Sequence, residues 1–292
     1  MKYFLLFFLF AGVLHGQDTF QQDPKLDCSY QNIGYIKIAC THQCQKKNRI
    51  VIQDVAQKLQ MSIEFTPLKL LKEGQSETVF DGILIEGGAD ITPELFTHLQ
   101  DESARFPQWK SYINKNMNSR DQLEWNKKDL FEFKFLKEYF SHNGYKKTPL
   151  LGICRGMQLL GVSHNIPLII DLKKQKDIKI PRYIVNPIKI QSSDSIISQI
   201  MDNRTHFEAW ENHHQAIDYD YYKKNLERLP NVRVSSTSHD DQIVETIEFK
   251  NRQALGVQFH PEYSSEEVQM KIFGNFLKNA CHNKIAKKIR AN

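Results

Sequence analysis

The sequence lacks the features that would place it outside ordinary globular proteins. It has no internal repeat and no low-complexity tract, which argues against a repeat protein or a disordered one. Hydrophobic residues make up 40% and charged residues 25%, a normal balance for a folded domain. With 292 residues, the chain is long enough to bury a sizeable core.

A strong excess of one charge is also missing. The chain has 39 Lys+Arg against 34 Asp+Glu, a net charge of +5, and the basic residues are scattered. Their densest group, Lys284, Lys287, Lys288 and Arg290, fits the solvated end of a helix. Nucleic-acid or anionic-membrane binding needs a clustered basic face or interleaved aromatic residues. The sequence therefore predicts neither partner, and it gives no indication of the oligomeric state.

No apolar run reaches the roughly 20 residues that a membrane-spanning helix needs. The longest run, 3–14, follows Lys2 and gives way to polar sequence at Gln17. One positive charge followed by about a dozen apolar residues is typical of a secretory signal peptide. We expect a leader over 1–16 and a mature domain over 17–292 without a stable membrane span. The protein is then periplasmic or secreted if the leader is cleaved, and cytoplasmic otherwise; an uncleaved anchor or a buried first strand are the alternatives.

Cysteine is scarce, with five residues in the whole chain. One of them, Cys154, lies in a motif described below. The other four, Cys28, Cys40, Cys44 and Cys281, allow three disulfide pairings in an oxidising compartment, and the sequence does not choose among them. The stretch from Cys40 to Cys44 has residue types that bind metals, but it lacks a second ligand pair at zinc-like spacing. The sequence predicts no metal and no other cofactor.

Strands and helices alternate along the chain, which is the pattern of a mostly parallel central sheet with helices on both faces. We expect a single α/β domain. The expected strands are Ile33–Ala39, Ser62–Pro67, Val79–Ile85, Pro149–Ile153, Ile166–Leu172, Val232–Ser236, Ile243–Phe249 and Ala254–Phe259. The expected helices are Ile50–Leu59, Lys128–Phe140, Arg155–Val162 and Val268–Asn279. The polar segment 97–126 is interpreted as an insertion over the domain surface, placed to act as a lid.

The most specific motif is Gly152-Ile153-Cys154-Arg155-Gly156. A strand ends, a glycine-flanked cysteine occupies the turn, and a helix begins, as in a nucleophile elbow with Cys in place of Ser. The glycines keep neighbouring side chains away from a tight turn. The helix N-terminus behind Cys154 favours its thiolate, and the backbone N–H of Arg155 points at a developing oxyanion. A buried core cysteine in an ordinary turn is the structural alternative.

Two further motifs fit this elbow. His260 ends an apolar strand, and Glu262 can orient its imidazole through a ring N–H, which is the logic of a catalytic triad. Earlier in the chain, a buried strand runs into Gly87-Gly88, whose backbone can approach a ligand closely and direct an N–H inward. Alone, each would indicate only an ordinary surface pair or turn. Together with Cys154 they predict acyl-transfer chemistry.

With these motifs the sequence resembles the class I glutamine amidotransferase-like superfamily, and most of all its γ-glutamyl-γ-aminobutyrate hydrolase group of cysteine peptidases. The resemblance covers nearly all of the chain after the leader. The similar pieces are Pro149–Leu160, Gly256–Glu262, Ile85–Pro93, Lys128–Glu132 and Asn212–Ile217. The chain departs from the group in four ways: it has Asn165-Ile166 in place of a Gly-Gly pair, Lys128 in place of Arg, a long insertion before Lys128, and a leader. These departures bear on which amine is the leaving group.

The resemblance implies a role for each matching residue. Cys154 is the nucleophile, His260 the general base and acid, and Glu262 its orienter, while Gly88 and Arg155 supply oxyanion N–H groups. It also implies that Gln158, His213, His214 and Gln215 lie near the γ-glutamyl group of a small substrate; an ordinary loop is the alternative for the histidines.

Three functions remain in view at this stage. The first is hydrolysis of γ-glutamyl amides or peptides through a thioester, with release of glutamate. The second is a glutaminase that supplies ammonia to a separate synthetase, although the chain has no recognisable ATP-binding half. The third is a non-catalytic binding protein on the same fold, which would have no physical need for Cys154, His260 and Glu262 together.

Overall fold

A computed structural model of the chain describes residues 27–41, 44–68, 80–92, 95–96, 119–180 and 184–291. The expected leader, 1–16, lies outside these residues. The described strands are β1 (Ile36–Cys40), β2 (Ile63–Pro67), β3 (Gly82–Ile85), β4 (Leu150–Ile153), β5 (Leu168–Ile169), β6 (Ile184–Ile190), β7 (His206–Glu211), β8 (Ala216–Ile217), β9 (Val232–Ser238), β10 (Ile243–Phe249) and β11 (Ala254–Val257).

Helices occupy most of the remaining described chain. They are α1 (Tyr30–Ile33), α2 (Lys46–Lys58), α5 (Ser119–Ser141), α6 (Arg155–Ser163), α7 (Leu172–Lys176), α8 (Ile196–Ile200), α9 (Tyr219–Lys224) and α10 (Glu266–Ala291). Single 3-10 turns lie at Asn143–Tyr145, Leu226–Arg228 and Pro261–Tyr263. Among these helices none combines the length and the apolar character needed to cross a bilayer.

The described chain forms one large sheet, in the order β2-β1-β3-β4-β11-β10-β9-β6-β7. Five neighbouring strands run parallel to one another: β2, β1, β3, β4 and β11. The sheet then continues with antiparallel pairing through β10, β9, β6 and β7. β3 and β4 are buried along their whole length, as expected for parallel strands covered on both faces. The expected α/β class with a mostly parallel central sheet is confirmed.

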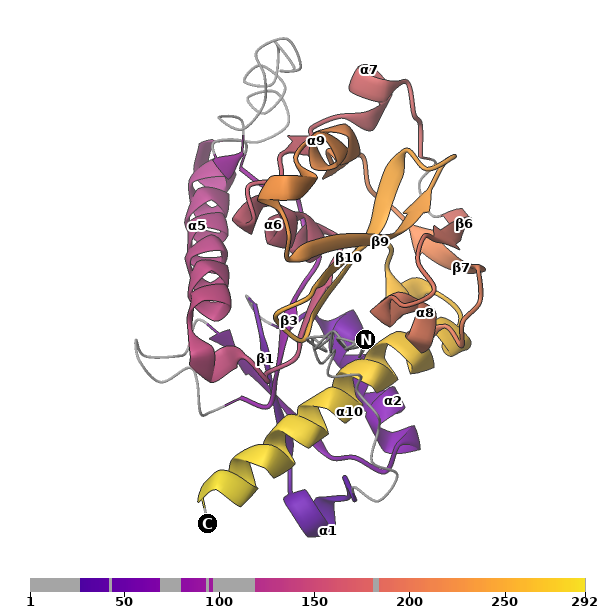
Figure 1. Ribbon diagram of the computed structural model, residues 1–292. Coiled ribbons are helices and arrows are strands. Elements are labelled where there is room, and N and C mark those ends of the chain that lie inside the picture. Colours follow the sequence, from indigo (N-terminus) through magenta and orange to yellow (C-terminus); the bar gives the residue numbers. More distant parts are fainter. Residues whose placement is uncertain are drawn as a thin grey trace, which may run out of the picture.

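Helices cover both faces of the sheet (Figure 1). On one face, apolar residues of α2, α8 and α10 form a core with β1 and β11. On the other face, α5 and α6 pack together over β3 and β4. The apolar stripe of α2, which includes Ile52 and Val55, is buried as its helical spacing predicts.

Some element boundaries differ from the expectation. The expected strand at Ile33 is wrong there, because Ile33 ends α1 and Gly34, at φ 69°, interrupts the chain before β1. The expected strand 166–172 shrinks to Leu168–Ile169, since the Asp171 side chain accepts a hydrogen bond from the Lys174 N–H and caps α7. The last eight residues of the segment 97–126 belong to α5, and 97–118 lie outside the described residues.

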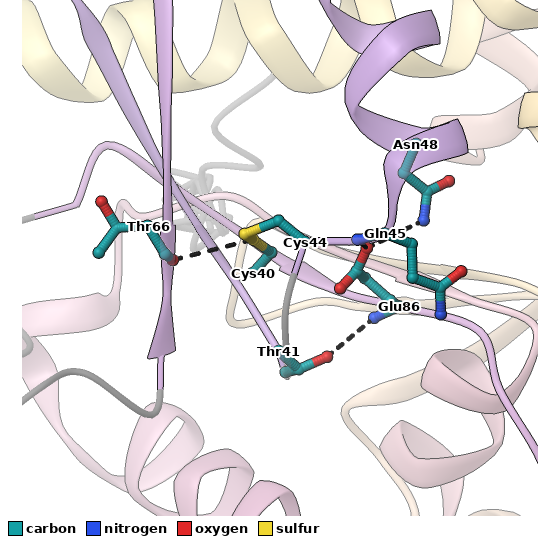
Figure 2. The surroundings of a disulfide bond; sticks show 7 residues. All are labelled: Cys40, Thr41, Cys44, Gln45, Asn48, Thr66 and Glu86. Carbon is teal, nitrogen blue, oxygen red and sulfur yellow. Dashed lines mark hydrogen bonds between the residues drawn. A yellow bond between two sulfur atoms is a disulfide. The ribbon is translucent and has the colours of Figure 1, made fainter.

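The four cysteines other than Cys154 form two disulfides. Cys28 pairs with Cys281, and Cys40 pairs with Cys44, with Cα–Cα distances of 5.9 and 5.2 Å. Both distances lie in the usual range for disulfides. The first bond joins the start of the described chain to α10, and the second closes the turn between β1 and α2 (Figure 2). The bond leaves neither Cys40 nor Cys44 a free thiolate.

Candidate active site

Three neighbouring parallel strands carry the three sequence motifs. β3, β4 and β11 lie side by side, with Ile85 opposite Gly152 and Val257 opposite Ile153. Because the carboxyl ends of parallel strands meet at the same edge of a sheet, the residues that follow them converge. The glycine pair, Cys154 and His260 thus meet at one edge, although they come from three distant parts of the sequence.

The elbow at Cys154 has the strained turn that its sequence predicts. Cys154 is buried, has φ 50° and ψ −106°, and is the N-cap of α6. A Cβ on Gly156 would lie 2.2 Å from the carbonyl oxygen of Ile85, and one on Gly152 would lie 2.9 Å from the Gly156 backbone. Both glycines are therefore required by close packing of α6 against β3 and β4. Among the five cysteines Cys154 alone is a free thiol.

His260 follows β11 and is held from two sides. Its Nδ1 lies 2.8 Å from Oε1 of Glu262, a carboxylate that is itself buried. Its backbone N–H donates to the carbonyl of Trp210, and the Trp210 ring meets the imidazole edge-on at 5.2 Å. These contacts fix the ring plane and leave Nε2 as the atom available for chemistry.

The electrostatics couple His260 to Cys154. Burial is the largest single effect and lowers the pKa of His260, but the charges and hydrogen bonds of Cys154 and Glu262 together outweigh it and raise this pKa to about 10. An imidazolium beside a thiolate is the resting state of many cysteine nucleophiles. The side-chain amide of Gln258 also donates to Sγ of Cys154 over 3.5 Å. Gln258 has no sequence signal of its own beyond its place in the His260 motif.

The loop after β3 closes over this pair. A Cβ on Gly87 would lie 3.4 Å from Cε1 of His260 and 3.7 Å from Cβ of Cys154. Gln45, the residue after the second disulfide, holds the loop: its backbone N–H donates to Glu86 and its side chain to the Gly87 carbonyl. Figure 2 shows the contact between Gln45 and Glu86 beside the Cys40–Cys44 turn. Burial raises the pKa of Glu86 to about 7.

A pocket of about 510 Å³ opens onto Cys154. This volume suits a small ligand. Several residues expected near a substrate line it: Gly88, Gln158, His213, His214 and Gln215. The segments 171–173 and 178–180 contribute another part of the wall, including Lys173 and Lys179, which no sequence motif singles out.

The expected binding residues differ in which of their polar atoms already have hydrogen-bond partners. The Gln158 amide already donates to the Gln215 carbonyl and to Gln258. Nδ1 of His213 lies 2.9 Å from the same carbonyl, and His214 pairs with Asp90 at 3.1 Å. Oε1 of Gln215 is buried without a hydrogen-bond partner.

The side chain of Arg155 points away from the pocket into a buried ion-pair cluster. It bonds Asp129 and Glu132, both on α5, and all three side chains are almost fully buried. Asp129 also accepts from the Thr92 N–H at 2.6 Å, in the loop that follows β3. The cluster therefore joins α5, the elbow and that loop, which accounts for the acidic residues of the segment 128–132.

Comparison with known proteins gives a consistent relationship. The sequence model of the peptidase C26 family matches residues 71–262. Protein NtpR of Enterococcus hirae is 26% identical over 68% of this chain and 74% of its own length. The glutamine amidotransferase-like protein YvdE of Lactococcus lactis is 28% identical with the same coverage of both chains. A subunit of the glutamine-hydrolysing GMP synthase from Picrophilus torridus is 30% identical over 49% of this chain and 64% of its own.

Solved structures share the fold. The glutaminase domain of Trypanosoma brucei CTPS, with bound acivicin, superposes with a TM-score of 0.61 at 13% identity, covering 85% of this chain and 94% of that domain. A protein from Thermoplasma acidophilum described as a GMP synthase subunit gives 0.53 at 17% identity, covering 88% and 98%. At these identities the likeness concerns the fold alone.

Proposed function

The chain belongs to the peptidase C26 family, a hydrolytic family with a glutamine amidotransferase-like domain, and we propose that it hydrolyses γ-glutamyl amides or short γ-glutamyl peptides. The observation that carries the proposal is the pairing of His260 with Cys154, which lines a small pocket. A non-catalytic protein has no use for a buried free thiol paired with a histidine.

In the proposed reaction, Sγ of Cys154 attacks the side-chain amide carbon of the substrate. The carbonyl oxygen becomes an oxyanion, which the backbone N–H groups of Gly88 and Arg155 would receive, since the first N–H groups of α6 have no partner within the helix. His260 gives its proton to the amine as the C–N bond breaks, and a thioester remains on Cys154. Water then attacks the thioester while His260 takes its proton, so glutamate leaves and the thiolate returns. Glu262 keeps the imidazole oriented throughout.

The pocket wall supports a substrate with the charges of a γ-glutamyl group. Such a group carries a free α-carboxylate and a free α-ammonium. Lys173 and Lys179 offer cations on one part of the wall, whereas Asp90 offers a carboxylate on another. We assign the substrate carboxylate to the lysines and the ammonium to Asp90.

A glutaminase that passes ammonia to a synthetase is the second candidate. It is favoured by the relatives described as glutamine-hydrolysing GMP synthase subunits, which match about half of this chain. The chemistry at Cys154 would be the same, with ammonia as the leaving group. The two candidates differ in whether turnover needs a partner protein.

We further propose that the protein works outside the cytosol. The two disulfides, Cys28–Cys281 and Cys40–Cys44, support this, because disulfides persist mainly in oxidising compartments. Sequencing the N-terminus of protein from the native host tests it: the proposal expects a start near residue 17, and an intact Met1 on cytosolic protein contradicts it.

A substrate panel tests the function. Purified protein is incubated alone with glutamine, γ-glutamyl-aminobutyrate and γ-glutamyl dipeptides, and both glutamate and ammonia are assayed, with Cys154→Ala as the control. The proposal expects glutamate from γ-glutamyl amides without any partner and none from the control. Cleavage of glutamine only after a synthetase is added would favour the second candidate, and no cleavage of any γ-glutamyl compound would refute the first.

A further inference from the structure

A buried cluster of two carboxylates and an imidazole lies behind one wall of the pocket. Glu211 ends β7, His213 follows two residues later, and Glu245 lies in β10. One potential ligand atom of each lies within 4.8 Å of the other two. The side chains of Glu211 and Glu245 have no exposed surface, and that of His213 is 2% exposed. The mechanism proposed above uses none of these three side chains directly.

Each member of the cluster has one atom in use and one atom without a partner. His213 Nδ1 faces the Gln215 carbonyl, so it carries the proton and leaves Nε2 with a lone pair. Glu211 Oε2 accepts from Asn186 at 2.6 Å, and Glu245 Oε1 accepts from Ser238 at 2.7 Å. The remaining atoms, Glu211 Oε1, His213 Nε2 and Glu245 Oε2, are buried without a hydrogen bond.

This arrangement places acceptors against acceptors. Two carboxylates and an imidazole lone pair, all removed from water, repel one another unless a proton or a cation lies between them. The nearby ring of His239 faces the other oxygen of Glu211, with Nε2 3.3 Å from Oε2. The backbone reinforces the arrangement, because the register between β10 and β9 shifts at Glu245, between Val244 and Thr246. Such a bulge redirects a side chain, and it is typical of positions beside functional sites.

From this geometry we propose that Glu211, His213 and Glu245 bind a divalent cation of the zinc class. A mixed imidazole and carboxylate set suits Zn²⁺ and its first-row neighbours better than Ca²⁺ or Mg²⁺. The hydrogen bonds at the second atoms are those that orient metal ligands: a ring N–H to a backbone carbonyl, and hydroxyl or amide donors to the carboxylates. No sequence motif singles out this set, because Glu245 is far along the chain from Glu211 and His213 and the three follow no ligand spacing.

The cation would join two parts of the chain. It would connect the bulge of β10 to the end of β7 and to the segment Asn212–Gln215 that directly follows β7 and lines the pocket. We assign it a structural role in holding that wall, with His213 as a positioning residue. The assignment is independent of the reaction proposed for Cys154.

Metal uptake tests the site without any substrate. The untagged full chain carries Cys154→Ala, so that the thiolate and His260 cannot offer a competing site. It is stripped with a chelator, equilibrated with a small excess of ZnCl₂, desalted and analysed for zinc by mass spectrometry. Adding Glu245→Gln should weaken zinc binding by more than the roughly 10–100-fold that loss of an outer partner costs.

Glu248→Gln is the matched control. It lies on the same strand, is buried and loses the same charge, but its carboxylate accepts from the N–H groups of Ile196 and Ile197 instead. The proposal expects one zinc per chain in Cys154→Ala and in the control. Zinc should raise the melting temperature of both relative to the stripped proteins. The cobalt-substituted protein should show no thiolate charge-transfer band. Glu211→Gln serves if Glu245→Gln does not fold. No stoichiometric zinc in Cys154→Ala, or equal zinc in the Glu245→Gln or Glu211→Gln variant, overturns the site and means that the two carboxylates share a proton.

Discussion

Replacing Arg155 by Met tests how the elbow is anchored. The guanidinium bonds Asp129 and Glu132, and all three side chains are at most 1% exposed. Methionine fills a similar volume and keeps the helix, but it leaves two buried carboxylates facing each other, with Lys128 at 4.0 Å from Glu132 as the nearby cation. Removing one partner of a buried ion pair typically costs about 3–5 kcal/mol. We expect a loss in that range in the free energy of unfolding, measured by urea titration at pH 8.

The cost should depend on pH and on the carboxylates. Burial raises the pKa of Asp129, and without Arg155 the cation that opposes this rise is gone. The contribution of Asp129 to stability is then greatest below its unfolded pKa, near pH 4, and falls as the pH rises through its folded pKa. The variant should therefore be closer to the wild type at pH 5 than at pH 8, and adding Asp129→Asn and Glu132→Gln should restore most of the loss at pH 8. A loss below about 1 kcal/mol, or no recovery in the triple variant, would refute the reasoning.

Three further predictions concern the site and its surroundings. We expect the alkaline limb of kcat/KM near pH 10 in the wild type, and Glu262→Gln should move it to lower pH, because Glu262 helps to raise the pKa of His260. A limb that does not move would contradict the assignment of this limb to His260. Burial raises the pKa of Glu86 from 4.5 to about 7, so ionisation of Glu86 destabilises the fold as pH rises. In urea titrations, Glu86→Gln should increase the free energy of unfolding by up to roughly 3 kcal/mol at pH 8 and by little at pH 4.5. An equal difference at both pH values would contradict this. Replacing Cys28 and Cys281 by serine should lower the free energy of unfolding by about 2–5 kcal/mol in urea titrations without reductant. An unchanged free energy of unfolding would contradict this.

The site edge is well predicted from the sequence because local signals and topology agree there. Gly152, Cys154 and Gly156 specify a strand, a strained turn and a helix, and β4 and α6 follow within a residue of the expected limits. Parallel strands then bring His260 to the same edge without any further information. The roles of the individual residues are still proposals, but their convergence follows from the pattern.

Other features depend on contacts that no local pattern carries. The sequence analysis did not predict β6 and β7. β6 contains Pro187, and its residues alternate between exposed and mostly half-buried positions, so it lacks the apolar run of a central strand. The Arg155 cluster pairs residues 23 and 26 positions apart on separate elements, and the Glu211–Glu245 pair forms only when β7 and β10 have folded. The disulfide partners were likewise set by the fold, since the three pairings are equivalent in sequence.

The central claim is that Cys154 becomes acylated by a γ-glutamyl group. In the most direct measurement, the enzyme is mixed with a γ-glutamyl amide and the reaction is stopped with acid after milliseconds to seconds. The mass of the intact protein is then determined by mass spectrometry. Peptide mapping then locates the added mass. The account predicts an increase equal to one glutamyl group, on Cys154, that appears before steady state, disappears as substrate is exhausted and never forms in Cys154→Ala. Release of glutamate with no adduct on Cys154, or from Cys154→Ala at a comparable rate, would contradict it.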